Sequence, residues 1–510
     1  MTMKLAALVY AGSLSPHAFE PLAGGASAYE RSLGFASALP GLERLVVAEG
    51  SIAPPSGPQE RFRRELWTVD GILEAMAEAG AGMDAIVLLW ADQPFLDLGL
   101  AGRMLENYRR YRAEYCFADG YPLGLAAEIV APRILPALRT LCASLPPEPA
   151  RDSLFSVIQK DINSFDIETA ISPLDLRDLR LTLACDTKRN TLLVERLLEA
   201  GVRDEGSALE VIPGRLDLLR TLPAFVQIQV AGGCPQSCAL CPYPGVGGDI
   251  LGRGDFMEKS RFVSILDQVE ALSGDAVIDI SLWGEPSRHP GIGDLIDEVL
   301  ARPGLSLIVE TSGLGWDRNL VRSLSEGLLA GRGAARLSWI VSLDAWSPEL
   351  YEKLRGSGYA EATSFAEFLI GLFPRGAYVQ CVRTRENEAE LEAFWRGWKK
   401  KTENVIVQKY SSFAGFLPQR RVSDLSPLLR RPCWHLKRDL AVGLDGSVPL
   451  CRECVRGEIQ LGNAFAEGGL EAAWAAGEAY HAAHIEAGSV PGSTYPRPCA
   501  ECDEYYTYNA

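Results

Sequence analysis

The feature that most constrains the fold is a unit that the chain repeats six times between residues 226 and 408. Each unit begins with a short apolar run and continues through a loop, and amphipathic stretches such as residues 262–272 and 389–398 lie between the runs. The short runs indicate buried strands and the longer stretches indicate helices. This alternation predicts a partial (β/α)6 barrel, in which the chemistry gathers at the C-terminal strand ends. The predicted strands are residues 226–230, 277–282, 305–310, 338–343, 378–382 and 405–408.

Three cysteines, Cys234, Cys238 and Cys241, follow the first of these strands through the pair Gly232 and Gly233. At these spacings the side chains could not all face one way on a strand, whereas a loop curling from a strand end can aim three thiolates at one point. Thiolates are soft ligands that favour iron–sulfur clusters. Three of them leave one iron of a four-iron cube without a protein ligand, so we expect another ligand there. A structural zinc loop and unconnected buried cysteines are the alternatives.

The segment 234–241, Cys-Pro-Gln-Ser-Cys-Ala-Leu-Cys, resembles the cluster loop of the radical S-adenosylmethionine (radical SAM) superfamily. Leu240 stands where that family often has an aromatic residue. The resemblance implies a [4Fe-4S] cluster whose open iron is chelated by the amino and carboxylate groups of S-adenosyl-L-methionine. It also implies that a reductant such as flavodoxin or ferredoxin donates an electron, and that the 5′-deoxyadenosyl radical so formed abstracts a hydrogen atom from a substrate.

Polar side chains follow the next four predicted strands. Trp283-Gly284-Glu285 resembles the family's Gly-Gly-Glu segment, which pairs with the amino group of the cosubstrate. The hydroxyl and carboxylate residues after the third and fourth strands match positions that in the family face the ribose and the methionyl carboxylate, and such groups suit sugar hydroxyls. Singly, several of them would pass as capping residues. The residues expected to bind S-adenosylmethionine are Trp283, Gly284, Glu285, Thr311, Ser312, Ser342, Asp344 and Arg383.

Five further cysteines lie between residues 433 and 502. The pair Asp445-Gly446 between two apolar runs predicts a hairpin that folds the chain back and brings Cys451 toward Cys433. The order of these cysteines resembles the SPASM extension of radical SAM proteins, which implies one auxiliary [4Fe-4S] cluster, because the later cysteines of the full pattern do not follow. Its expected ligands are Cys433, Cys451, Cys499 and Cys502, with Cys454 as a spare, a substitute ligand or an acid/base group. The alternative is a zinc site of Cys451, Cys454, Cys499 and Cys502.

The first two hundred residues alternate strand-like and helix-like runs, which predicts an α/β layer with a largely parallel sheet. Ligands of such sheets sit at strand ends. Asp92 follows one apolar run, and Asp186 closes another segment ahead of a helix that begins near Asn190. The strand-like runs are residues 5–10, 44–48, 85–90 and 125–131, and the helix-like runs are 28–39, 100–111 and 133–141.

The aspartate pair resembles nucleotidyltransferases of the glycosyltransferase-A-like class, in which two aspartates hold Mg²⁺ on the nucleotide phosphates. The resemblance implies a Rossmann-like domain and a magnesium site at Asp92 and Asp186. The opening loop of that class carries an arginine and a lysine, whereas residues 11–22 contain neither. We therefore expect a degenerate domain that binds a substrate, a nucleotide or another protein without group transfer. Alternatively, both aspartates merely cap loops and helices.

Composition limits the partners and the surroundings. The net charge of −16 argues against nucleic acid or an anionic membrane surface as the main partner. Twelve cysteines in 510 residues are too dilute for a disulfide scaffold, and eight of them fall in the two groups above, which indicates ligands in a reducing compartment. We expect a cytoplasmic protein with three domains. These are a nucleotidyltransferase-like α/β domain at 1–205, a radical SAM partial barrel at 222–412 and a small SPASM-like cluster domain at 425–510.

The leading functional hypothesis is a radical SAM enzyme. Relatives with the SPASM extension often modify peptides or proteins, so the resemblance implies a peptide or protein substrate. One alternative is a nucleotidyltransferase that acts through the first domain in sugar or cofactor biosynthesis. Another is a non-catalytic iron–sulfur scaffold or sensor.

Overall fold

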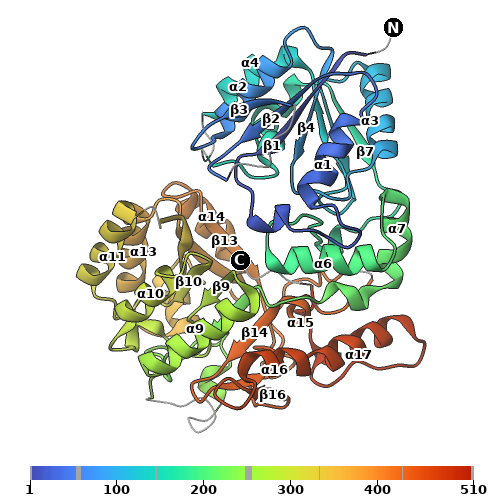
Figure 1. The fold of residues 1–510 in the computed structure, drawn as a ribbon. Coiled ribbons are helices and arrows are strands. Elements are labelled where there is room, and N and C mark those ends of the chain that lie inside the picture. Colours follow the sequence, from blue (N-terminus) through green and yellow to red (C-terminus); the bar gives the residue numbers. More distant parts are fainter. Residues whose placement is uncertain are drawn as a thin grey trace. The chain divides into compact units, whose positions relative to one another are not determined.

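The structure is a computed structural model that describes residues 3–52, 59–143, 146, 148–246, 255–331, 334–427 and 429–506. The chain forms two compact units, Met1–Thr221 and Leu222–Ala510, which are described separately below (Figure 1). The three domain boundaries expected from the sequence stay predictions. Within the described ranges, no helix combines the length and the apolar character needed to cross a bilayer.

The first unit contains a seven-stranded sheet in the order β3-β2-β1-β4-β6-β5-β7. All neighbouring strands run parallel except at β6, which is antiparallel to both β4 and β5. The largely parallel α/β sheet predicted from the sequence is therefore confirmed. The strands are β1 (Leu5–Ala11), β2 (Leu42–Glu49), β3 (Glu60–Arg63), β4 (Ala85–Trp90), β5 (Tyr115–Asp119), β6 (Glu128–Val130) and β7 (Ile167–Ile171).

Helices cover both faces of this sheet (Figure 1). Along β1, Leu5 and Val9 pack with α1 and α3, while Leu8 and Tyr10 pack with α2, α4 and α5. A strand that is buried on both faces needs a continuous apolar run, which is why β1 lacks alternation with polar residues. The helices are α1 (Ala28–Ser37), α2 (Val69–Ala79), α3 (Leu98–Tyr111), α4 (Leu135–Cys142), α5 (Ser153–Ile158), α6 (Lys188–Glu199) and α7 (Glu205–Gly214).

The second unit contains a seven-stranded sheet in the order β13-β12-β11-β10-β9-β8-β14, in which every pairing is parallel. Six strands follow one another in chain order, as the sequence predicts. The seventh, β14, comes from the C-terminal region and pairs with β8, with Val442 opposite Ile228. The strands are β8 (Phe225–Ile228), β9 (Ala276–Asp279), β10 (Leu305–Thr311), β11 (Leu337–Ser342), β12 (Ala377–Arg383), β13 (Val405–Lys409) and β14 (Asp439–Val442).

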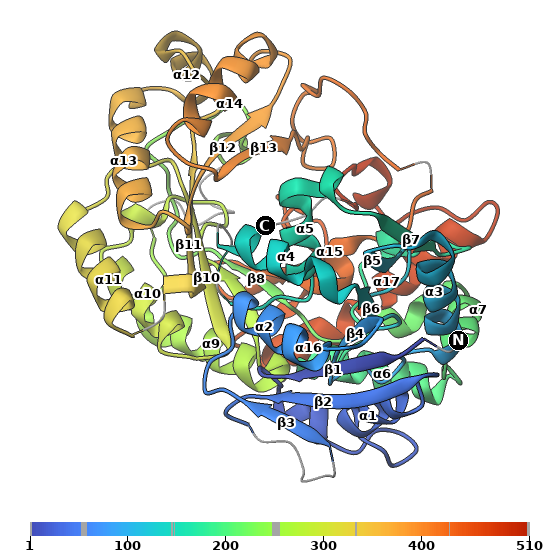
Figure 2. The same ribbon diagram turned by 90° about the horizontal axis from the view of Figure 1, so that it is seen from above.

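Alternate residues of these strands face the helices. In β10, Leu305, Leu307 and Val309 belong to the core that includes side chains of α10 and α11, whereas Glu310 does not. Figure 2 shows α10, α11 and α13 on the outer side of strands β10 and β11. The other side of each strand is thus free to carry polar residues. The helices are α9 (Lys259–Ser273), α10 (Ile292–Leu300), α11 (Arg318–Gly331), α12 (Pro348–Arg355), α13 (Tyr359–Leu372) and α14 (Leu391–Lys399).

The C-terminal region contains the turn that the sequence predicted, between strands that find separate partners. Gly446 does form a tight turn, with φ +85°, and donates its N–H to the carbonyl of Gly443. The flanking strands, however, find different partners: β14 joins β8, and β15 pairs with the antiparallel β16. The strands on either side of the turn therefore belong to different sheets. The predicted fold-back itself is confirmed, because Gly443 donates its N–H to the carbonyl of Ser447 and Cys451 packs against the cluster that contains Cys433. The remaining elements are α15 (Trp434–Arg438), β15 (Ser447–Pro449), β16 (Gln460–Asn463), α16 (Gly469–Ala476) and α17 (Glu478–Ser489).

Candidate active site

A cavity of about 220 Å³ opens at the C-terminal strand ends of the second sheet. The three cysteines of the loop after β8 line it together with Glu285, Thr311, Ser312, Ser342 and Asp344. Gly284 permits this assembly, because a Cβ at that position would stand 1.9 Å from the carbonyl oxygen of Ala231. The structure therefore brings the predicted cluster loop and most of the predicted cosubstrate residues to one place.

Burial controls the protonation of the three cysteine thiols. Removal from water raises the pKa of Cys234 and of Cys241 to about 12 and also raises the pKa of Cys238. In each case the nearby charge of Arg355 opposes the increase. Without a metal the thiols are thus neutral at pH 7, and a bound metal must displace their protons. Three half-buried cysteines that line one cavity offer sulfur donors that fit a cluster of soft metal ions.

Glu285 lies after β9 in the segment that the sequence singled out. Its carboxylate accepts hydrogen bonds from Thr311 Oγ1 at 2.5 Å and from the backbone N–H of Ser312 at 2.8 Å. Trp316 donates its Nε1 hydrogen to Thr311 Oγ1 at 2.8 Å, which orients the threonine hydroxyl toward the carboxylate. Burial raises the pKa of Glu285, and these hydrogen bonds limit the rise. Glu285 is a fixed acceptor in the cavity wall.

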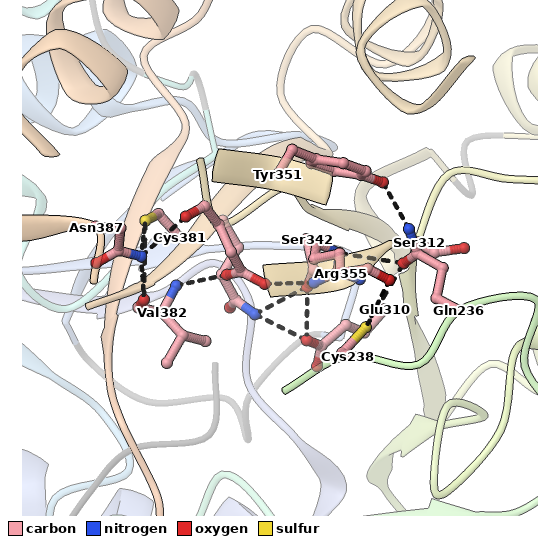
Figure 3. A network of polar contacts seen from close by, with 12 residues as sticks. Gln236, Cys238, Glu310, Ser312, Ser342, Tyr351, Arg355, Cys381, Val382 and Asn387 are labelled. Atoms are coloured by element: carbon pink, nitrogen blue, oxygen red, sulfur yellow. Dashed lines mark hydrogen bonds and ion pairs between the residues drawn. The ribbon is translucent and has the colours of Figure 1, made fainter. Parts of the chain in front are cut away.

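Asp344 and Arg355 form a buried ion pair. Figure 3 shows Arg355 close to Gln236 and Cys238 of the cysteine loop. Asp344, with φ +62°, also accepts the backbone N–H of Val382 at 2.7 Å. The amide of Asn387 donates to the backbone carbonyls of Asp344 and Val382, both at 2.8 Å. Arg355 donates to Gln236, a residue of the cysteine loop, at 3.1 Å. Burial alone would lower the pKa of Arg355, but Cys238 in its ionised form and the carboxylate of Asp344 raise that pKa above its ordinary value.

Several polar side chains of the strands themselves also line the cavity. Gln227 Nε2 donates to Asp279 at 3.0 Å, and Glu310 accepts hydrogen bonds from Ser342 at 2.9 Å and Gln380 at 2.7 Å. Desolvation raises the pKa of Asp279 and of Glu310, and the charge of Arg452 moderates both shifts. Gln227, Asp279, Glu310, Ser342 and Arg452 all line the cavity. Such a floor can hydrogen-bond a polar group of a ligand.

The five C-terminal cysteines gather in a second place. Cys433, Cys454 and Cys499 are buried in one cluster with Leu436 and Tyr505, and Cys451 packs against it. Burial raises the pKa of Cys502, and the nearby Glu453, Cys433 and Cys451 raise it further, which places Cys502 beside this cluster. Among the side chains that the structure describes, no three or more His, Cys, Asp or Glu residues converge as a site for a single metal ion. The identity of the metal group and its four ligands stay predictions.

Three other predicted site residues, Arg383, Asp92 and Asp186, have protein partners that the sequence did not indicate. Arg383 pairs with Glu388 and is not among the described residues that line the cavity. In the first unit, Asp92 and Asp186 do lie together, and the guanidinium of Arg151 bridges them. The roles assigned to these residues from the sequence stay predictions.

Several residues of the site were missed from the sequence. Glu310 and Asp279 occupy the polar side of otherwise apolar strands, so strand alternation could have identified them. Gln236 lies inside the cysteine loop, and its contact with Tyr351 at 2.8 Å joins positions 115 residues apart. Arg355 has no local signal, because its partner Gln236 lies 119 residues earlier in the chain. Arg452 pairs with its neighbour Glu453, and only the fold brings it to the cavity.

No family model matches the chain. The chain is 38% identical over 369 residues to an uncharacterized protein of Treponema pallidum (strain Nichols), which is 70% of this chain and 98% of that protein. A second uncharacterized protein of the same strain is 46% identical over 65 residues, 13% of this chain and 30% of that protein. The chain belongs to the same family as the first of these Treponema pallidum proteins.

Three solved structures are similar at low sequence identity. Streptococcus suis SuiB bound to S-adenosylmethionine is 14% identical with a TM-score of 0.41, covering 61% of this chain and 80% of SuiB. BtrN in complex with AdoMet and 2-DOIA is 16% identical with a TM-score of 0.35, covering 52% and 88%. A cytidylyltransferase from Leptospira borgpetersenii is 17% identical with a TM-score of 0.35, covering 42% and 96%.

Proposed function

We propose that this protein is a radical SAM enzyme that abstracts a hydrogen atom from its substrate. The observation that supports this most is that Cys234, Cys238 and Cys241 line the same cavity as Glu285 and Asp344. When bound there, a [4Fe-4S] cluster would pass one electron from an external reductant to S-adenosylmethionine, and the chemistry it would supply is cleavage of the cosubstrate to methionine with abstraction of a substrate hydrogen atom.

The chain's own residues hold and orient the two groups. Cys234, Cys238 and Cys241 are the proposed cluster ligands. Glu285 is the proposed acceptor for the amino group of the cosubstrate. The hydroxyl of Thr311 and the backbone N–H of Ser312 hold the carboxylate of Glu285 in place by hydrogen bonds. Hydroxyl and carboxylate groups at Ser342 and Asp344 are suitable partners for ribose hydroxyls. Fixed dipoles of this kind bind without the cost of reorganising loose side chains.

The auxiliary site belongs to the same proposal. Cys433, Cys451, Cys499 and Cys502 are the proposed ligands of a second [4Fe-4S] cluster, with Cys454 as a substitute. Flavodoxin or ferredoxin is the proposed reductant. Arg452, between Cys451 and Cys454, lines the cavity of the first site, so the two sites are linked by one short turn.

The proposed substrate is a peptide or protein, on the strength of the SPASM resemblance. The polar layer of Gln227, Asp279, Glu310 and Ser342 supports a substrate that presents a hydrogen-bonding group to the cavity floor. An apolar group there would leave these buried polar atoms without a partner for their remaining hydrogen bonds, which costs about 1–3 kcal/mol each.

The test is anaerobic turnover of S-adenosylmethionine with dithionite. The wild type should release methionine and 5′-deoxyadenosine, measured by mass spectrometry, and the variant Cys234→Ala/Cys238→Ala/Cys241→Ala should release neither. Cys116→Ala is the matched control, because Cys116 is a buried cysteine of the first unit. Equal cleavage by the wild type and the triple variant would overturn the proposal.

A further inference from the structure

The first unit contains an ion cluster that the proposed radical chemistry does not use. Arg151 lies just before α5, and its two terminal nitrogens reach both predicted magnesium ligands. Nη1 and Nη2 donate to the two oxygens of Asp92 at 3.0 and 2.6 Å, and Nη2 also donates to Asp186 Oδ2 at 3.0 Å. The guanidinium therefore stands between the carboxylates, where a shared cation would have to lie.

The one carboxylate oxygen that Arg151 does not contact also has a hydrogen-bond donor. Asn190, in the first turn of α6, donates its side-chain N–H to Asp186 Oδ1 at 2.8 Å. Each of the four carboxylate oxygens thus accepts a hydrogen bond from a protein donor. The guanidinium of Arg151 also lies over the ring of Trp90, with its central carbon 4.8 Å from the ring centroid. Planar stacking and a bidentate fork hold an arginine in one orientation far better than a lysine.

Burial makes this arrangement hard to open. The side chain of Asp92 is 3% exposed and that of Arg151 is 16% exposed, whereas that of Asp186 is 31% exposed, so the Arg151 to Asp92 pair is the buried part of the cluster. Burial alone would lower the pKa of Arg151, but its pairing with Asp92 and Asp186 raises it above the ordinary value, so the cation is permanent. A buried charge that loses its partner is strongly destabilising. Mg²⁺ requires an octahedron of oxygen ligands at 2.0–2.1 Å, and a fixed positive charge between those oxygens excludes it.

We propose that Arg151 takes the place of a divalent cation between Asp92 and Asp186, so that the first unit holds no metal–nucleotide at this position. The arginine instead fastens three segments, the loop after β4, the turn before α5 and the loop before α6. The lack of any lysine or arginine in residues 11–22 agrees with this, because a triphosphate would find no neutralising charge there either. The residues do not fit magnesium-dependent nucleotidyl transfer.

The experiment counts Mn²⁺ bound to the full-length protein by room-temperature electron paramagnetic resonance. The probe is MnCl₂, alone and with an equimolar mixture of the four ribonucleoside triphosphates. Wild type and Asp186→Asn should bind the same number of ions, because the site takes none. Arg151→Met should gain one ion per chain, and Arg151→Met/Asp92→Asn should lose that ion again.

Two results would overturn the proposal. One is a wild-type Mn²⁺ ion that disappears in Asp186→Asn, since the carboxylates would then hold a metal beside the arginine. The other is a folded Arg151→Met protein, checked by circular dichroism, that gains no ion. Where Arg151→Met does not fold, the comparison of wild type with Asp186→Asn decides, since that variant keeps the Arg151 to Asp92 pair.

Discussion

Arg355, the last residue of α12, donates its Nε hydrogen to the side-chain oxygen of Gln236, 3.1 Å away in the cysteine loop. The same guanidinium pairs with Asp344 at the end of β11. The loop that carries the proposed cluster ligands is therefore tied to a strand end by one buried arginine (Figure 3). A loop held in this way keeps its three thiols in place before any metal is bound.

Removal of this arginine should destabilise the second unit. Arg355→Met leaves the carboxylate of Asp344 buried without its cation, so we expect the free energy of unfolding to fall by about 3–5 kcal/mol. Urea unfolding of the purified protein, followed by circular dichroism, measures the change. The double variant Arg355→Met/Asp344→Asn should lose less than the single variant, because no charge is left unpaired. A double variant that is as unstable as the sum of both singles would contradict this explanation.

Thr311 should matter for cosubstrate affinity through Glu285. In Thr311→Val the carboxylate loses its 2.5 Å donor. A hydrogen bond to a charged group contributes about 1.5–3 kcal/mol, so we expect the Kd for S-adenosylmethionine to rise about 10- to 100-fold. Isothermal titration calorimetry under anaerobic conditions measures it. Thr363→Val is the control, because the hydroxyl of Thr363 donates only to backbone carbonyls of its own helix. Equal affinities in wild type and Thr311→Val would show that Glu285 does not hold the cosubstrate.

The raised pKa of Glu128 should make the stability of the first unit depend on pH. Burial raises the pKa of its carboxyl from 4.5 to about 7, and Tyr115 donates a hydrogen bond to it. Since the folded pKa is the higher one, this group's contribution to the free energy of unfolding is full below pH 4.5 and is lost as the pH rises through 7. Glu128→Gln keeps the acceptor for Tyr115 and removes the charge.

We therefore expect Glu128→Gln to be more stable than the wild type at pH 8, by on the order of 2 kcal/mol. The gain is below the full value of the shift because the side chain keeps some contact with water. At pH 4, below the ordinary pKa of the carboxyl, the two proteins should unfold at nearly the same urea concentration. A constant difference between the two proteins at pH 4 and pH 8 would rule out the ionisation of Glu128 as its cause.

The regular part of the second unit could be predicted from the sequence because its signal is local. Each strand from β8 to β13 is a short apolar run, and the loop cysteines and Glu285 follow strand ends directly. Parallel strands place their C-terminal ends at one edge, so residues predicted separately meet in one cavity.

The interactions that complete the site could not be predicted in the same way. The pairing of β14 with β8 joins residues more than two hundred positions apart, and the local turn signal at Asp445-Gly446 predicted only the fold-back. Likewise Asp92 and Asp186 were expected to share a site, but Arg151 lies in a segment with no strand-end pattern. Long-range charge pairing leaves no periodic trace in a sequence.

The central claim is that the loop at Cys234, Cys238 and Cys241 holds a four-iron cluster that binds S-adenosylmethionine. Its most direct test is the iron and sulfide content of the anaerobically purified, dithionite-reduced protein, with its low-temperature electron paramagnetic resonance spectrum before and after addition of S-adenosylmethionine. We predict about eight irons per chain and one signal that shifts on addition, whereas the triple alanine variant keeps about four irons and lacks that signal. A wild-type protein that contains zinc in place of iron, or whose spectrum is unchanged by S-adenosylmethionine, would contradict the account.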